Sequence, residues 1–137
     1  MTLSWTVFVD RCLGGRRMKP MLTEAGWSVV LHDELFEQDA PDVEWLPVVA
    51  ASGHVILTRD KQIRRRPDEL LAIVESGARV VFVGFEGNMR SYVSALLAGA
   101  QRLQQVFDAH APPVAVKLHR DGAVELTPLP RSATDPA

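Results

Sequence analysis

Short apolar runs alternate with longer stretches of helical spacing along most of the chain. Four apolar runs predict buried strands, at Trp5–Asp10, Trp27–Leu31, Val55–Leu57 and Arg79–Phe85. Between and after these runs, apolar residues recur every three or four positions, which predicts helices. The expected helices lie at Arg16–Ala25, Val43–Ala50, Pro67–Val74 and Asn88–Ala109. The acidic segment 35–41 is expected to be a loop.

Glycine and proline mark the ends of several predicted helices. Gly26, Gly53 and Gly77 each follow the last apolar position of a helix, where glycine closes a helix at low cost. Pro20 is tolerable only in a first turn, so the first helix is expected to begin near position 16 or 17.

The last third of the chain predicts a β-hairpin after the longest helix. Val114–Leu118 and Ala123–Leu126 flank a turn at Arg120-Asp121-Gly122, and residues 131–137 are expected to be a flexible tail. Strands that alternate with helices build parallel sheets covered on both faces. The expected fold is therefore one α/β domain over residues 1–130, a three-layer α/β/α sandwich with a mainly parallel sheet and a C-terminal β-hairpin extension.

Composition narrows the protein class without identifying a function. The 137 residues are 47% hydrophobic and 23% charged, with a formal net charge of −2, which is ordinary globular composition. That charge argues against a protein that wraps nucleic acid by bulk electrostatics, although a local basic patch stays open. Cys12 is the single cysteine, which excludes a disulfide framework and a thiolate metal site. No apolar run reaches membrane-spanning length, and the first residues lack a signal peptide's pattern, so we expect a cytoplasmic protein.

Two of the predicted strands end at an aspartate, which draws attention to one edge of the sheet. Asp10 closes the first strand, and Asp60 follows the third. The carboxyl ends of parallel strands meet at one edge, where such folds bind ligands. Carboxylate oxygens suit Mg²⁺ or Mn²⁺ better than zinc, and such a cation activates water for phosphodiester hydrolysis. Further acids compete for a place in this crevice, namely Asp33, Glu34, Asp39, Asp42 and Glu44.

Each candidate also has an ordinary structural interpretation. Asp10 suits a turn cap, Asp42 suits a helix N-cap, and Asp60 suits a surface ion pair. The run Arg64-Arg65-Arg66 is typical of a solvated face, and beside an acidic site it also suits contact with RNA phosphates. His32 and His54 are expected to be structural.

The order of these motifs resembles the PIN-like superfamily of metal-dependent nucleases. The resemblance covers about residues 7–85, and its motifs are Phe8-Val9-Asp10, the acidic helix start Asp42-Val43-Glu44-Trp45-Leu46, and Leu57-Thr58-Arg59-Asp60-Lys61. It implies that Asp10, Asp42 and Asp60 are the catalytic, metal-binding carboxylates for Mg²⁺ or Mn²⁺. It leaves the fourth acid open between Asp33, Glu34, Asp39 and Glu44, of which Glu44 is the favoured one. No aspartate follows the fourth strand, which opens the alternative of a single metal.

The chain is most similar to the compact branch of PIN-like toxins from bacterial toxin–antitoxin pairs. This resemblance implies a metal-dependent ribonuclease with an RNA substrate, a cognate antitoxin partner and no membrane association, and a homodimer stays open. Lys61 and Arg64 are then expected to contact substrate phosphate.

Two alternatives belong to other functional classes. A phosphoacceptor receiver domain also carries an aspartate after its third strand and a lysine after its fifth, which Asp60 and Lys117 imitate. A receiver needs a second acid beside Asp10, where this chain has Arg11. The other alternative is a PIN-like module that binds RNA or protein without cutting.

Overall fold

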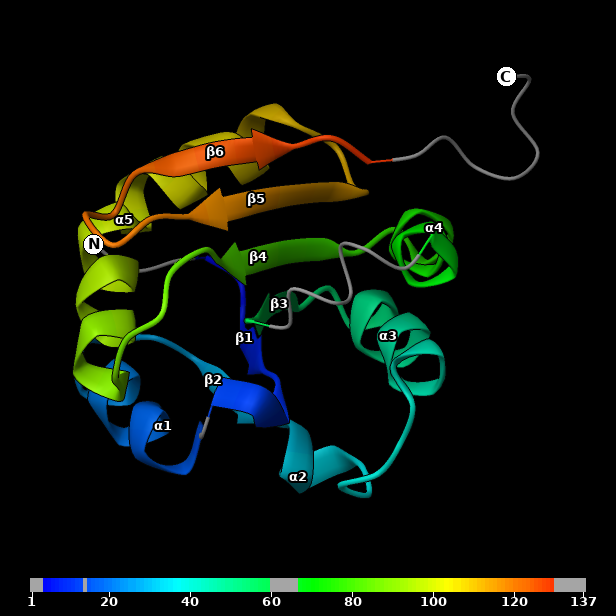
Figure 1. Cartoon of the computed structure of the whole chain (residues 1–137), viewed down its shortest axis with the longest axis horizontal. Helices are drawn as coiled ribbons and strands as arrows, with labels where there is room; N and C mark the ends of the chain where they lie inside the picture. The colour runs from blue at the N-terminus through cyan, green and yellow to red at the C-terminus, as the bar shows by residue number, and fades with distance from the viewer. Residues whose placement is uncertain (1–3, 14, 60–66, 130–137) are drawn as a thin grey trace.

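A six-stranded sheet forms the middle layer of the protein in the computed structural model, which describes residues 4–13, 15–59 and 67–129 (Figure 1). Within those residues the strand order is β2-β1-β3-β4-β5-β6, and only β6 runs antiparallel to its neighbour. The strands are β1 (Val7–Val9), β2 (Val29–Leu31), β3 (Val55–Thr58), β4 (Arg79–Val83), β5 (Val114–Leu118) and β6 (Val124–Thr127).

Helices cover both faces of the sheet, as the sequence predicts. One face carries α1 (Gly15–Glu24) and α5 (Met89–Ala109), and the other carries α3 (Asp42–Ala51) and α4 (Pro67–Ser76) (Figure 1). Two shorter helices, η1 (Arg11–Leu13) and α2 (His32–Leu35), follow β1 and β2. The three-layer α/β/α architecture with a C-terminal β5–β6 hairpin is confirmed.

Alternation along the strands divides the core into two parts. In β1, Val7 and Val9 pack with α1 and α5, whereas Phe8 packs with Trp45 of α3 on the opposite face. In β3, Ile56 belongs to the same core as Phe8. Burial on both faces explains why these strands read as continuous apolar runs, since every side chain meets a helix layer.

The helix α2 was not predicted, because a local cap rather than an apolar period creates it. The segment 35–41 was expected to be a loop, and Leu35 instead ends this helix. Glu34 accepts a hydrogen bond from the backbone N–H of Leu31 at 2.8 Å and another from Lys19 Nζ at 2.8 Å. A glutamate that reaches back to the backbone before its helix stabilises the first turn.

Most predicted boundaries lie within one or two residues of the observed ones. Gly26, Gly53 and Gly77 have positive φ angles of 91°, 77° and 69°, which confirms the glycine helix ends. The predicted helix start near position 16 or 17 lies within two residues of the observed start at Gly15, but Pro20 lies in the second turn rather than in the first. Pro20 is exposed, so its ring points to solvent. The expected tail lies outside the described residues.

No helix in the described part of the chain is both long enough and apolar enough to span a bilayer.

Candidate functional site

Asp10 lies at the carboxyl end of β1 and is almost completely buried. Only 4% of its surface is exposed, and its backbone N–H donates to Leu57 O of the neighbouring β3 at 2.9 Å. Thr58 is the last residue of β3 and is also buried. Phe8 and Ile56 lie opposite each other in the adjacent strands β1 and β3. Asp10 and Thr58 each follow them by two residues, so their side chains lie on the same face of the sheet and meet there.

Both carboxylate oxygens of Asp10 are fixed by neutral donors. Oδ1 accepts the backbone N–H of Arg11 at 2.7 Å, and Oδ2 accepts the Thr58 hydroxyl at 2.8 Å. The backbone carbonyl of Asp10 accepts from Leu13 N at 3.2 Å, within the short helix η1. Asp10 therefore also has the turn-capping contact of its ordinary structural interpretation, and this contact holds the carboxylate in one orientation at the edge of the sheet.

The Cys12 thiol is a third neighbour of this carboxylate. Although the residue keeps an exposed surface, Cys12 Sγ lies 3.7 Å from Asp10 Oδ2 and 3.5 Å from Thr58 Oγ1. Burial raises the pKa of the Cys12 thiol, and the negative charge of Asp10 raises it further. The group is therefore a neutral thiol that donates weakly to Asp10, and it is not a thiolate nucleophile.

Arg11 is oriented by a buried histidine on α2. Arg11 Nη1 lies 2.9 Å from His32 Nε2 and 3.3 Å from the carbonyl oxygen of Ala40. A guanidinium only donates, so His32 Nε2 must accept, and its ring proton is on Nδ1. His32 is 1% exposed, and its Nδ1 lies 3.5 Å from Asp33 Oδ1. The expectation that His32 is structural is consistent with its burial, and the contact shows which group it orients.

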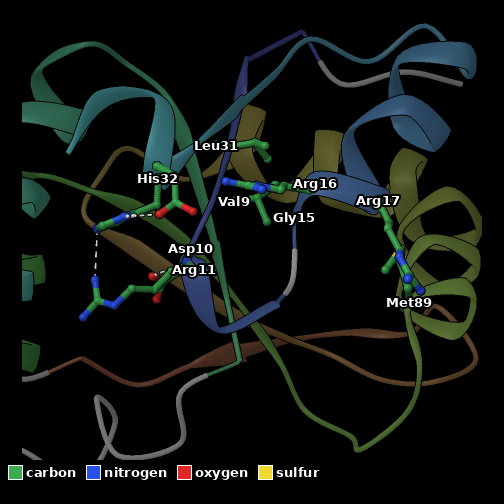
Figure 2. Close-up of a pocket in the computed structure, with 10 residues that line it drawn as sticks. Val9, Asp10, Arg11, Gly15, Arg16, Arg17, Leu31, His32 and Met89 are labelled. Atoms are coloured by element: carbon green, nitrogen blue, oxygen red, sulfur yellow. Dashed lines mark hydrogen bonds and ion pairs between the residues drawn. The ribbon is translucent and has the colours of Figure 1, made fainter. Parts of the chain in front are cut away.

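A cavity of about 350 Å³ opens beside Asp10 and Arg11 (Figure 2). Its walls include Arg16 and Arg17 from the first turn of α1 and Asp33 from α2. Val9, Leu31 and Met89 contribute apolar surface. Two carboxylates and three arginines thus surround one opening at the edge of the sheet.

The predicted site residues fall into three groups. Asp10 lines the cavity, whereas Glu44 is exposed and lines a neighbouring depression together with Arg16 and Asp33. Asp33 is an acid that borders both hollows. The backbone of Asp42 begins α3, but its side chain is outside the described part of the structure, as are the whole of Asp60, Lys61 and Arg64.

The chemistry around Asp10 fits a hard divalent cation. Its charge is buried, and its hydrogen bonds come from an amide, a hydroxyl and a thiol rather than from a cationic side chain. Within residues 4–13, 15–59 and 67–129 no ion pair to Asp10 is formed. A buried carboxylate without a cationic partner is costly, and a metal ion relieves that cost. No group of three acid, histidine or cysteine side chains suited to a metal is found in those residues.

Sequence reasoning missed three contributors to this site. Thr58 was noted only as part of a motif, and its hydroxyl role follows from the pairing of β1 with β3. Arg16 and Arg17 were treated as a helix start, although their place six and seven residues after Asp10 was a usable signal.

The receiver-like alternative loses support on geometric grounds. Lys117 lies within β5 and packs over Gly84, where an added Cβ would meet Lys117 Cε at 2.5 Å, and it does not follow the strand. Arg11 occupies the position of the second acid and contacts His32 instead.

Comparisons with known proteins agree with this architecture. A family model described as a PIN-like domain matches residues 6–84. A protein of Mycobacterium tuberculosis named "Putative ribonuclease VapC45" is 30% identical over 81 residues, which cover 56% of this chain and 59% of that protein. The chain thus spans under two thirds of that relative's length. No solved structure gives a significant match. The matched region contains β1 to β4 and the Asp10 site, and the chain belongs to the PIN-like domain family.

Proposed function

We propose that this protein is a metal-dependent ribonuclease that hydrolyses RNA phosphodiester bonds. The observation that carries the proposal is the buried Asp10 carboxylate, which neutral donors hold at the edge of the sheet beside an arginine-lined cavity. Family membership and the similarity to a protein named as a ribonuclease support the same activity.

The metal site is proposed to consist of Asp10, Asp42 and Asp60, with Mg²⁺ or Mn²⁺ as the cation. When bound, such a cation lowers the pKa of a water ligand and stabilises the charge that develops on phosphate. Asp10 supplies a fixed ligand, since Thr58 and the Arg11 amide already set its orientation. Glu44 stays the sequence-based prediction for a fourth acid, and Asp33 competes because it shares the cavity with Asp10.

The substrate is proposed to be held by cationic side chains around that carboxylate. Arg11 lines the cavity in an orientation that His32 and the Ala40 carbonyl fix. Lys61 and Arg64 are proposed to contact phosphate from the segment that follows Thr58 and Arg59 in the chain. A phosphodiester that lies between these cations and Asp10 is placed for attack by an activated water.

The biological role is proposed to be that of the toxin in a toxin–antitoxin pair that acts in the cytoplasm. Its partner is then a cognate antitoxin protein, and a homodimer of the chain is the second proposed assembly. The sequence similarity to the mycobacterial protein supports this role.

The proposal is tested by cleavage of a short single-stranded RNA in Mn²⁺, with EDTA as the metal-free control. Asp10→Asn is expected to lower kcat/KM by at least about 100-fold, since even residues that only support a metal ligand cost 10–100-fold. Asp60→Asn is expected to cause the same loss. Asp108→Asn is the matched control, because this exposed residue lies in the last turn of α5 and its remaining oxygen still accepts from Gln104.

Two outcomes would overturn the catalytic assignment. One is cleavage that survives Asp10→Asn, and the other is cleavage that persists in EDTA. RNA binding without any cleavage by the unmodified protein would instead favour a PIN-like module that binds but does not cut.

A further inference from the structure

We propose that the cavity beside Asp10 is a subsite for one nucleotide of a single RNA strand, and that Arg16 and Arg17 bind its phosphate. The inference rests on the proposed function, because it names how the substrate of that same site is held. It assigns substrate binding to α1, in addition to Lys61 and Arg64, for which the sequence motif predicts phosphate contact.

Arg16 and Arg17 are cationic side chains without a structural task in the described part of the protein. Both are exposed, both line the cavity, and neither forms a hydrogen bond or ion pair with another described residue. Their neighbour Lys19 on the same helix behaves differently, since it pairs with Glu34 at 2.8 Å. Arginine is suited to phosphate because its planar group offers several donors in fixed geometry.

The charge of the cavity favours an anion. Among the lining residues, the three arginines Arg11, Arg16 and Arg17 outnumber the two aspartates, Asp10 and Asp33. Figure 2 shows Arg16 extending toward the side of the cavity where His32 lies, and Arg17 beside Met89. The two guanidinium groups therefore border different parts of the opening.

The same cavity offers apolar surface for a sugar or base. Leu31 and Met89 are partly exposed beside the two arginines. Gly15 brings α1 close to this surface, since a Cβ at that position would lie 2.7 Å from Leu31 Cδ2 and 3.1 Å from Val9 Cγ1. A residue larger than glycine would push the first turn of α1, and with it Arg16, away from the sheet.

The cavity has the size of a small-ligand site, which one nucleotide can enter. About 350 Å³ is at the lower end of the 300–1,000 Å³ typical of small-ligand sites. A base inside a duplex is stacked and paired, so only an unpaired nucleotide can place its base against this apolar surface. Unpaired RNA exposes both its bases and its phosphates to such a site.

Binding is measured by fluorescence anisotropy with an eight-nucleotide, 5′-labelled single-stranded RNA in Mg²⁺ buffer. The protein carries Asp10→Asn throughout, so that no cleavage occurs. Arg16→Ala and Arg17→Ala are each expected to weaken binding by about tenfold, the effect of a lost charge-assisted hydrogen bond. Each is also expected to lower the salt slope of the association constant by about 0.7, the value for one phosphate contact on a single strand.

The matched control is Arg102→Ala, which removes the same charge from an exposed position on α5 that does not line the cavity. It is expected to leave the affinity and the salt slope unchanged. Thermal unfolding of each variant checks that the fold is intact. Equal binding by Arg16→Ala, Arg17→Ala and Arg102→Ala would overturn the proposal.

A second experiment identifies the phosphate itself. One charged linkage of the RNA is replaced by a neutral methylphosphonate, and the replacement is moved along the strand. At one position, the neutral linkage is expected to weaken binding to the protein that carries Asp10→Asn alone by about tenfold. The same linkage is expected to weaken binding to the Arg16→Ala variant much less, because both changes remove the same contact. Full additivity at every position would contradict a phosphate subsite at Arg16.

The proposed subsite and the proposed nuclease activity can be refuted independently of each other. Loss of binding in Arg16→Ala together with no metal-dependent cleavage by the unmodified protein would retain the subsite and refute the ribonuclease. Cleavage that depends on Asp10, together with arginine variants that bind like Arg102→Ala, would retain the ribonuclease and refute the subsite.

Discussion

Two acid-containing regions lie side by side, and they differ in how their carboxylates are held. The cavity beside Asp10 contains two acids, of which Asp10 is buried and accepts hydrogen bonds on both oxygens. The neighbouring depression is larger, about 860 Å³, and all its acids are exposed. Those acids are Asp33, Glu34, Glu37, Asp39 and Glu44.

This difference is why the metal site is proposed at Asp10 rather than where acids are most numerous. Exposed acids such as Glu37, Asp39 and Glu44 keep rotamer freedom in solvent, so each must be ordered before it binds a cation. Asp10 is ordered already, because its strand, its amide donor and the Thr58 hydroxyl fix it. A preorganised ligand retains the binding energy that a mobile acid loses on ordering.

The largest expected effect on stability comes from the donor that holds Asp10. Thr58→Val keeps the side-chain volume and removes the hydroxyl, so Asp10 Oδ2 loses its 2.8 Å hydrogen bond. We expect the free energy of unfolding to fall by about 1–3 kcal/mol, the cost of an unsatisfied buried acceptor. Urea unfolding measures it. Thr58→Ser restores the hydroxyl and should recover most of the loss, whereas an equal loss in both variants would place the effect in packing.

The hydrogen bond between Arg11 and His32 should survive only those substitutions of His32 that keep an acceptor at the position of Nε2. His32→Gln can place an acceptor near the former Nε2, while the shorter side chain of His32→Asn cannot reach Arg11. We expect the loss of unfolding free energy to be about 1 kcal/mol smaller for glutamine than for asparagine. We also expect only His32→Asn to raise the KM for RNA. Similar KM values for both variants would show that His32 serves packing against Phe8 and Trp45 alone.

The two candidates for a fourth metal-binding acid, Asp33 and Glu44, differ in whether they line the cavity beside Asp10. We expect Asp33→Asn to raise the Mn²⁺ concentration for half-maximal cleavage several-fold, because Asp33 shares the cavity with Asp10. Glu44→Gln, in the neighbouring depression, should have the smaller effect. A larger effect for Glu44→Gln would instead support Glu44, the acid that the sequence motif favours, as the fourth metal ligand.

The smallest expected effect lies in the exposed region. The hydrogen bond from Lys19 lowers the pKa of Glu34, and the Leu31 amide lowers it further. A group whose pKa is lowered by folding stabilises the protein above its unfolded pKa, and this stabilisation is lost as the pH falls below about 4. Because the Lys19–Glu34 pair is solvent-exposed, we expect Glu34→Gln to cost only a few tenths of a kcal/mol at pH 7. A loss above 1 kcal/mol would mean that Glu34 holds α2 in place.

Periodicity predicted the layers and the place of Asp10, because strands and long helices follow from local apolar patterns. The continuous run before Asp10 predicted a buried strand, and the observed strand β1 lies between β2 and β3. The partners of the site depend on distant pairs that no local pattern records. Arg11 meets His32 from 21 positions away, and Thr58 meets Asp10 from 48 positions away. The helix α2, which carries Asp33 and Glu34, depends on the capping contact of Glu34. Because no apolar pattern predicts this helix, the candidates for the fourth acid could not be ranked from the sequence.

The central claim is that Asp10 anchors a divalent cation, and its most direct test is the melting temperature of the RNA-free protein with and without Mn²⁺. Mn²⁺ at 100 times its Kd should stabilise the native state by about 2.7 kcal/mol, which raises the melting temperature by several degrees. The same shift is expected in Asp108→Asn and no shift in Asp10→Asn. An equal Mn²⁺-induced rise in the parent protein and in Asp10→Asn would contradict the claim.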